Sequence, residues 1–139
     1  MEMVAQAQAE LLNECCGLLG GCIEKTGAGP IGRVWRRFPL VNAAASPSEY
    51  LSEPKSMFAA EKARRDEAID FLAVYHSHPT SRPVPSAIDL ARSYSPDVMN
   101  LIISLQSSAP EMRGWWLLTD RYTEAEYELV DGLRQGGDF

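Results

Sequence analysis

The run Phe71-Leu72-Ala73-Val74-Tyr75, continued by His76-Ser77-His78-Pro79, is the stretch from which both the fold and the chemistry of this chain are predicted. Its first five residues are continuously apolar, which is typical of a buried strand. Residues i and i+2 of a strand point to the same face, so His76 and His78 project together. Pro79 cannot continue the hydrogen-bond ladder. The stretch therefore predicts two imidazoles side by side at the end of a central strand.

A candidate third ligand follows shortly after the two histidines. The chain crosses a Pro-rich loop, 80–85, and Ser86-Ala87-Ile88-Asp89 then opens a predicted short helix, 86–94. Asp89 can return to a metal ion held by the two histidines, and imidazole nitrogens suit zinc. Two histidines and one carboxylate leave a fourth coordination position open, as in catalytic zinc sites.

A purely structural interpretation of the same residues stays open. Ser86-x-x-Asp89 fits a helix capping box, although that motif prefers Glu or Gln at its last position. A histidine at a strand end can also be a polar cap. The combination favours the metal, because the only two histidines of the chain stand at i and i+2 and an acid follows them.

The pattern His76-x-His78-Pro79, six residues, then Ser86-x-x-Asp89, resembles the motif of the JAMM/MPN+ zinc metallopeptidases. The family also has an upstream glutamate, often in a Glu-x-Cys-Gly setting, and this chain has Glu14-Cys15-Cys16-Gly17. The likeness extends over about residues 9–131 and is greatest to the small bacterial Mov34/MPN/PAD-1 (JAB) members.

The resemblance implies one Zn²⁺ per chain, bound by His76, His78 and Asp89. It also implies that Glu14 is the general base and that Ser86 holds the developing oxyanion. The implied reaction is hydrolysis of a peptide or isopeptide bond at the C-terminal tail of a ubiquitin-like protein, and processing of a sulfur carrier to expose Gly-Gly is favoured. Two alternatives remain, a deubiquitinase-like isopeptidase acting on conjugates and a non-catalytic MPN scaffold or binding module.

Hydrophobic periodicity and turn residues predict a mixed α/β fold in a single domain, 1–131, followed by a flexible tail, 132–139. The pattern suggests one mixed sheet with helices against it, and the family resemblance implies an MPN-type domain with a central mixed, mostly antiparallel sheet flanked by helices. The predicted helices are 3–14, 55–67 and 86–94. The predicted strands are 16–23, 31–41, 71–78, 98–105, 112–118 and 122–130, with a short strand considered near Tyr50. Glu14 falls at the end of the first helix. Without the motif, a glutamate at this position is expected to be solvated.

Composition narrows the class of protein. The 139 residues suit one domain, and 45% hydrophobic with 23% charged residues is ordinary for a soluble globular protein. The net charge of −6 argues against a non-specific nucleic-acid binder. No apolar run has the length of a membrane span, and Met1-Glu2-Met3 does not begin a signal peptide, so we expect a cytoplasmic protein without membrane or nucleic-acid partners. A homodimer stays open.

The three cysteines, Cys15, Cys16 and Cys22, form no Cys-x-x-Cys pair and suggest neither a disulfide framework nor a thiolate zinc site. Cys16 could serve as a nucleophile beside a histidine, but a small buried side chain at a strand start is the favoured interpretation.

The motifs of other zinc enzymes fit this sequence less well. The His-x-Glu and Pro-Cys-x-x-Cys patterns of deaminases and the His-Glu-x-x-His helix of many proteases are absent from the sequence.

Overall fold

The computed structural model describes residues 1–93 and 95–130, so the predicted tail, 132–139, and the domain boundary at 131 lie outside the described residues. In chain order the elements are α1 (Glu2–Ala9), β1 (Cys16–Thr26), β2 (Gly29–Leu40), α2 (Pro54–Glu67), β3 (Asp70–His78), α3 (Ala87–Ala91), β4 (Met99–Ser104), β5 (Glu111–Leu117) and β6 (Tyr122–Ala125). This order of helices and strands is the predicted one.

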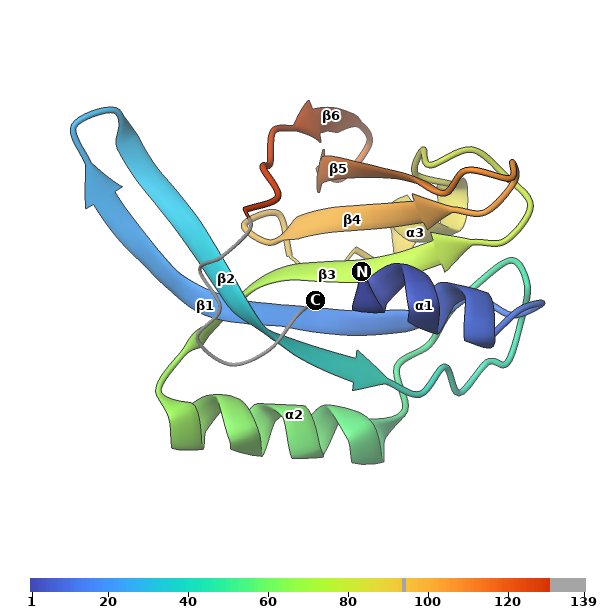
Figure 1. Cartoon of the computed structure of the whole chain (residues 1–139), viewed down its shortest axis with the longest axis horizontal. Coiled ribbons are helices and arrows are strands. Elements are labelled where there is room, and N and C mark those ends of the chain that lie inside the picture. The colour runs from blue at the N-terminus through green and yellow to red at the C-terminus, as the bar shows by residue number, and fades with distance from the viewer. Residues whose placement is uncertain (94, 131–139) are drawn as a thin grey trace.

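Within the described residues the strands form one six-stranded sheet in the order β2-β1-β3-β4-β5-β6 (Figure 1). β3 and β4 are parallel, and the other neighbouring strands are antiparallel. A parallel pair needs a crossover connection, and the segment that contains α3 supplies it. The predicted mixed, mostly antiparallel sheet flanked by helices is therefore confirmed. β3, which carries the two histidines, lies inside the sheet between β1 and β4.

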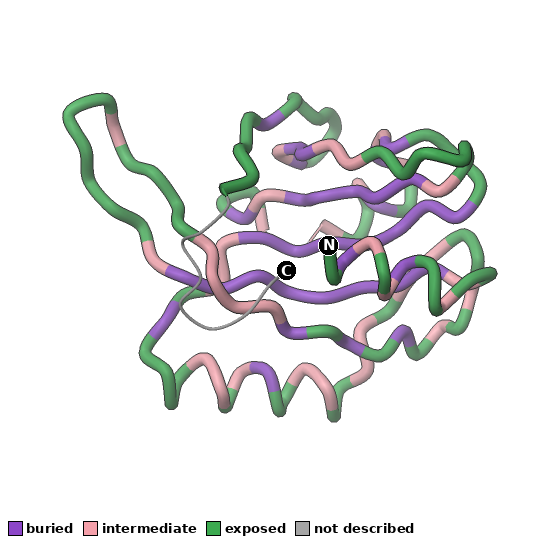
Figure 2. Tube along the Cα trace, in the orientation of Figure 1, coloured by how far each residue is buried: buried purple, intermediate pink, exposed green. Residues whose placement is uncertain are grey.

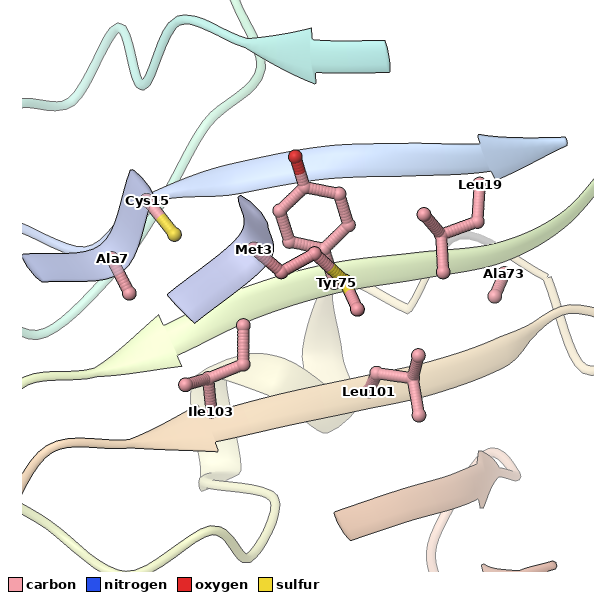
Figure 3. Close-up of a cluster of buried hydrophobic side chains, with 8 residues drawn as sticks. All are labelled: Met3, Ala7, Cys15, Leu19, Ala73, Tyr75, Leu101 and Ile103. Carbon is pink, nitrogen blue, oxygen red and sulfur yellow. The ribbon is translucent and has the colours of Figure 1, made fainter. Parts of the chain in front are cut away.

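One face of the sheet is covered by α1. Met3 and Ala7 of this helix are fully buried and pack in a cluster with Cys15, Leu19, Ala73, Tyr75, Leu101 and Ile103 (Figure 3). The Tyr75 ring lies against the backbone of Gly17, where an added Cβ atom would overlap the ring. Glycine is required at this position because the strand and the aromatic ring approach each other so closely.

The opposite face of the sheet is covered by α2 and α3. Ala60 of α2 packs in a cluster with Leu18 and Val74, and Leu90 of α3 packs against Ile102 of β4. Residues of a strand alternate between faces, so His76 and His78 lie on the same face as Val74. In Figure 2 most of β3 and β4 is buried, whereas α2 and the tip of the β1–β2 hairpin are largely exposed. The histidines are thus on the face of the sheet opposite α1.

The first helix is shorter than predicted. It ends at Ala9 instead of continuing to residue 14. The apolar stripe runs on in the sequence, but Leu11 is 47% exposed and Leu12 is 75% exposed, so neither finds a surface to pack against. The backbone instead turns to join the sheet, where the amide of Ser77 donates to the carbonyl of Cys15. Tertiary pairing therefore overrides helix propensity here.

Other predictions of element bounds were also wrong. The last strand ends at Ala125 instead of residue 130, and only a single bridge, Asn42 to Ser52, replaces a strand near Tyr50. The short helix ends at Ala91, and residue 94 lies outside the described residues. Apolar residues after Ala125 are exposed, so burial does not extend the strand. In residues 1–93 and 95–130, no helix has both the length and the apolar character needed to cross a bilayer.

Candidate metal centre

The end of β3 brings the two histidines together. In the sheet His76 is opposite Cys16 of β1 and Ile102 of β4, and His78 is opposite Ser104. His76 is 0% exposed and His78 is 4% exposed. Hydrogen bonding on both sides of β3 fixes its backbone, so the positions of both imidazoles are set by the sheet. The predicted pairing of these side chains on one face is present.

The loop after β3 is held by side chains from the neighbouring strands. The Ser104 hydroxyl donates to the Ser81 carbonyl at 2.6 Å, and the Trp115 Nε1–H donates to the Pro83 carbonyl at 2.8 Å. His78 Nδ1 lies 2.8 Å from the Arg82 carbonyl oxygen. These contacts turn the chain back toward the strand end, so that α3 begins next to the histidines.

α3 opens with the capping box considered from the sequence. The Asp89 amide donates to Ser86 Oγ at 3.1 Å, and the Ser86 amide donates to Asp89 Oδ2 at 2.8 Å. Asp89 is 7% exposed, and its other contacts are with the two histidines. The structural and the metal-site interpretations of Ser86-x-x-Asp89 are thus compatible, because the cap fixes the carboxylate that faces the imidazoles.

The three predicted ligands converge on one point. His76 Nε2 and His78 Nε2 are 3.1 Å apart, and they lie 3.2 Å and 3.1 Å from Asp89 Oδ1 and Oδ2. One ligand atom from each residue falls within 4.8 Å of the others. An Nδ1–H of His78 that donates to the Arg82 carbonyl leaves the Nε2 lone pair for a metal ion. The donor set of two imidazoles and one carboxylate fits zinc.

The charges of this group are mutually stabilising. Burial alone would raise the pKa of Asp89, but hydrogen bonds from both imidazoles and from the Ser86 amide outweigh it and hold that pKa far below its usual range. Burial acts to lower the pKa of His78, yet its hydrogen bonds with Asp89 and the Arg82 carbonyl raise it overall. The carboxylate is therefore ionised, as a metal ligand must be.

Glu14 lies in the segment that leads into β1, and it is 3% exposed. Its amide donates to the Ser46 carbonyl at 2.8 Å, and its carbonyl accepts from Asn42 Nδ2 at 3.0 Å. The following residue, Cys15, donates its amide to Ser77 Oγ at 2.7 Å. Because Cys15 packs on the α1 face, alternation turns Glu14 toward the face that carries the histidines. The expectation of a solvated residue at a helix end was wrong.

The Glu14 carboxyl interacts electrostatically with two of the three predicted metal ligands, His76, His78 and Asp89, which are called the metal group below. Burial raises its pKa to about 8, while the charge of His78 lowers it and that of Asp89 raises it. Among the described residues, the buried side-chain polar atoms without a hydrogen-bond partner are Glu14 Oε1 and His76 Nδ1. Such atoms are rare in folded proteins and concentrate at functional sites. Both belong to the residues that the sequence motif singled out.

Ser86 is half-buried at the start of α3. Its oxygen accepts the Asp89 amide, which leaves the hydroxyl hydrogen available to another acceptor. Cys16 is 1% exposed, and burial raises the pKa of its thiol to about 12. A thiol in that state is not a nucleophile near neutral pH, so the structural interpretation of Cys16 is the one that the geometry supports.

Sequence reasoning missed the residues that hold this site together. They are Asn42, Tyr50, Ser77 and Trp115, which contact the backbone or rings of the site through an amide, an aromatic ring, a hydroxyl and an indole, in that order. Each belongs to an unremarkable local pattern, and only Ser77, between the two histidines, has a position that could have drawn attention. Their partners lie far away in the chain, so no spacing rule reveals them.

Comparison with known proteins gives concordant matches. The family described as prokaryotic homologs of the JAB domain matches residues 1–118. A protein of Mycobacterium tuberculosis named CysO-cysteine peptidase is 28% identical over 132 residues, which cover 93% of this chain and 85% of the relative. A protein of Haloferax volcanii named desampylase is 35% identical over 92 residues, which cover 66% of this chain and 62% of the relative.

A solved structure also resembles this fold. The solution structure of a protein from Desulfitobacterium hafniense has a TM-score of 0.81 at 34% sequence identity, and the match covers 95% of this chain and 88% of that one. The family match spans α1 through β5 and therefore includes Glu14 and the complete His76, His78 and Asp89 group. The chain belongs to the prokaryotic homologs of the JAB domain, that is, to the JAMM-type metallopeptidases.

Proposed function

We propose that this protein is a zinc-dependent peptidase that hydrolyses a peptide or isopeptide bond at the C-terminal tail of a ubiquitin-like protein. The observation that carries the proposal is the convergence of His76, His78 and Asp89 within 4.8 Å, together with the buried carboxyl of Glu14, which interacts electrostatically with His78 and Asp89 and whose Oε1 has no hydrogen-bond partner among the described residues. A metal-binding group next to a carboxyl of raised pKa is the arrangement that metal-assisted hydrolysis requires.

His76, His78 and Asp89 would hold one Zn²⁺. Zinc bound in such a site lowers the pKa of a bound water to about 7 and polarises a carbonyl oxygen. The protein's part is to keep Asp89 ionised and to hold the ligands in place, which the Asp89 cap and the contact of His78 with the Arg82 carbonyl support.

Glu14 would accept a proton from the attacking water and deliver it to the leaving amine nitrogen. Its carboxyl is suited to both steps because burial raises its pKa to about 8, close to neutral pH. The water oxygen bonds to the carbonyl carbon first, the C–N bond then breaks as the amine nitrogen takes the proton, and no covalent link to the protein forms.

Ser86 would stabilise the oxyanion that develops on the substrate carbonyl. The Ser86 oxygen already accepts the Asp89 amide at 3.1 Å, so its O–H is free to donate to a negatively charged oxygen. Ser86 is half-buried whereas Asp89 is buried, which is consistent with a hydroxyl that a substrate can reach.

We favour the processing of a sulfur-carrier protein to expose a Gly-Gly end in the cytoplasm. The match to the CysO-cysteine peptidase, which spans nearly the whole chain, supports this choice. An isopeptidase that acts on protein conjugates is the second candidate. Its support is a relative of Thermus thermophilus named as a probable TtuB-protein conjugate cleaving protease, 41% identical over 58 residues, which cover 41% of this chain and 39% of the relative.

The test joins metal content with product analysis. Elemental analysis of wild type is expected to give about one zinc per chain, and that of His78→Ala almost none, because one ligand is lost. Mass spectrometry then follows a small carrier protein that ends in Gly-Gly plus extra residues, in parallel with the same carrier joined to a lysine through an isopeptide bond. Glu14→Gln is expected to retain zinc and lose cleavage of both.

Each result distinguishes one of the candidates. Faster cleavage of the extended carrier supports the processing enzyme, whereas faster cleavage of the isopeptide favours the conjugate-directed alternative. A folded, metal-supplemented wild type without zinc would leave the scaffold or binding module as the remaining interpretation. A Glu14→Gln protein with zinc and full activity would refute the role of Glu14.

A further inference from the structure

The two histidines of the site are held in different ways. His78 Nδ1 lies 2.8 Å from the Arg82 carbonyl, which fixes the orientation of its ring. His76 Nδ1 is buried and has no hydrogen-bond partner among the described residues. Metal-binding histidines are usually oriented by a hydrogen bond from the second ring nitrogen to an acceptor. The orientation of the His76 ring must therefore come from another contact.

Tyr50 supplies that contact. Its ring stacks on the His76 ring with centroids 4.8 Å apart and an interplanar angle of 28°. His76 is 0% exposed, so the tyrosine ring covers one flat side of the imidazole. By contrast, the His76 and His78 rings are tilted by 56° and do not stack on each other. Stacking constrains the ring plane of His76 and so the direction in which Nε2 points.

The loop that carries Tyr50 is itself fixed by Asn42. Asn42 Nδ2 donates to the carbonyls of Glu14 and Glu49, and Asn42 Oδ1 accepts the amides of Ala44 and Leu51. These four bonds use the full capacity of the amide side chain, which is 8% exposed. The residues on either side of Tyr50 are thus anchored, Glu49 through its carbonyl and Leu51 through its amide.

A second link joins this loop to α3. Glu49 Oε2 lies 3.7 Å from Arg92 Nη1, at the C-terminal cap of the helix that carries Asp89. Both side chains are partly exposed, so the pair contributes little energy by itself. Its geometry nevertheless places the loop beside the metal ligands, where Tyr50 lies over His76.

We propose that Tyr50 is a positioning residue for the metal ligand His76, and that its ring takes the part that the Arg82 carbonyl plays for His78. This inference rests on the metal site proposed above. Tyr50 acts through His76 and is given no contact with substrate. The stack, and not the hydroxyl group, is the operative feature, because the Tyr50 hydroxyl has no hydrogen bond to any residue of 1–93 or 95–130.

The experiment compares Tyr50→Leu with Tyr50→Phe. Zinc affinity is measured by competition with a chromophoric chelator, and thermal unfolding of the metal-free proteins checks that both are folded. Tyr50→Leu is expected to bind zinc about 10- to 100-fold more weakly, the usual effect of losing a group that orients a metal ligand. Tyr50→Phe, which keeps the ring, is expected to stay within about twofold of wild type.

Phe58→Leu is the matched control. Phe58 lies on α2 and is 69% exposed, so this change removes an aromatic ring without touching the metal group. It is expected to leave zinc affinity unchanged. Equal affinities of Tyr50→Leu and wild type would overturn the proposal. So would an equal loss in Tyr50→Phe and Tyr50→Leu, because the hydroxyl would then be the important group.

A nuclear magnetic resonance readout keeps the proposal testable if Tyr50→Leu does not fold. The chain has two histidines, so its imidazole spectrum is simple, and His78→Gln assigns the signals. In wild type and Tyr50→Phe the ring protons of His76 are expected upfield of those of His78, because the stacked ring shields them. Absence of this shift in wild type would refute the stack even if zinc binds. Failure of wild type to bind zinc would refute the metal site and with it this inference, whereas a zinc-binding wild type that cleaves no carrier would refute the proposed function alone.

Discussion

Replacement of Glu14 by glutamine is expected to stabilise the metal-free protein at neutral pH. Burial raises the pKa of Glu14 from 4.5 to about 8, and Glu14 Oε1 has no hydrogen-bond partner. The folded protein therefore binds this proton more tightly than the unfolded chain does. Between pH 4.5 and 8 the folded state holds more protons, so its stability falls as pH rises.

The size of the effect follows from the shift in pKa. One unit of pKa corresponds to 1.36 kcal/mol, so at pH 7 the buried carboxyl costs roughly 3 kcal/mol and above pH 8 at most about 5 kcal/mol. Below pH 4.5 the cost vanishes, because the carboxyl is then protonated in both states. Because glutamine does not ionise, the stability of the variant lacks this contribution to the pH dependence.

The assay is urea unfolding of wild type and Glu14→Gln with a chelator present, at several pH values from 5 to 8. The difference in unfolding free energy is expected to grow by up to about 1.4 kcal/mol per pH unit, in favour of the variant. Titration of other groups in the site largely cancels in this difference. The exposed Glu126→Gln is the control and should show no such slope. A difference that stays constant with pH, or a wild type more stable at pH 8, would refute the reasoning.

Two further substitutions test the packing around the site. Gly17→Ala places a Cβ atom in the buried Tyr75 ring and is expected to cost about 1–3 kcal/mol in urea unfolding, whereas Gly27→Ala, where nothing lies within 4 Å, should be nearly neutral. Trp115→Phe removes the donor to the Pro83 carbonyl and is expected to cost about 1–3 kcal/mol and to weaken zinc binding, and Trp116→Phe, on the opposite face, is its control. Equal stability losses within either pair would contradict the assigned contacts.

The metal-binding group was predictable from the sequence because its rules are local. The spacing of His76 and His78 sets them on one face of any strand, and Ser86 with Asp89 fits the start of any helix. The buried run before the histidines also indicated a central strand. The order of helices and strands in the sequence was sufficient to predict a mixed sheet, which the structure confirms.

The boundaries of several elements were not predictable in the same way. Residues 10–14 have a helical pattern, yet they leave the helix because the backbone of Cys15 pairs with Ser77 in the sheet. The last strand stops at Ala125 although apolar residues follow, and those residues, Tyr127, Leu129 and Val130, are exposed. In both places a distant partner, or its lack, outweighs local propensity.

The sequence by itself singled out the three candidate metal ligands and the family to which they point. Only the tertiary structure decided the environment of Glu14, because the pairing of β1 with β3 brings its segment to the histidines and burial then raises its pKa. The same holds for the stack of Tyr50 on His76. Ligand spacing is a property of one short segment, whereas burial and stacking arise from surfaces that come together only when the whole chain folds.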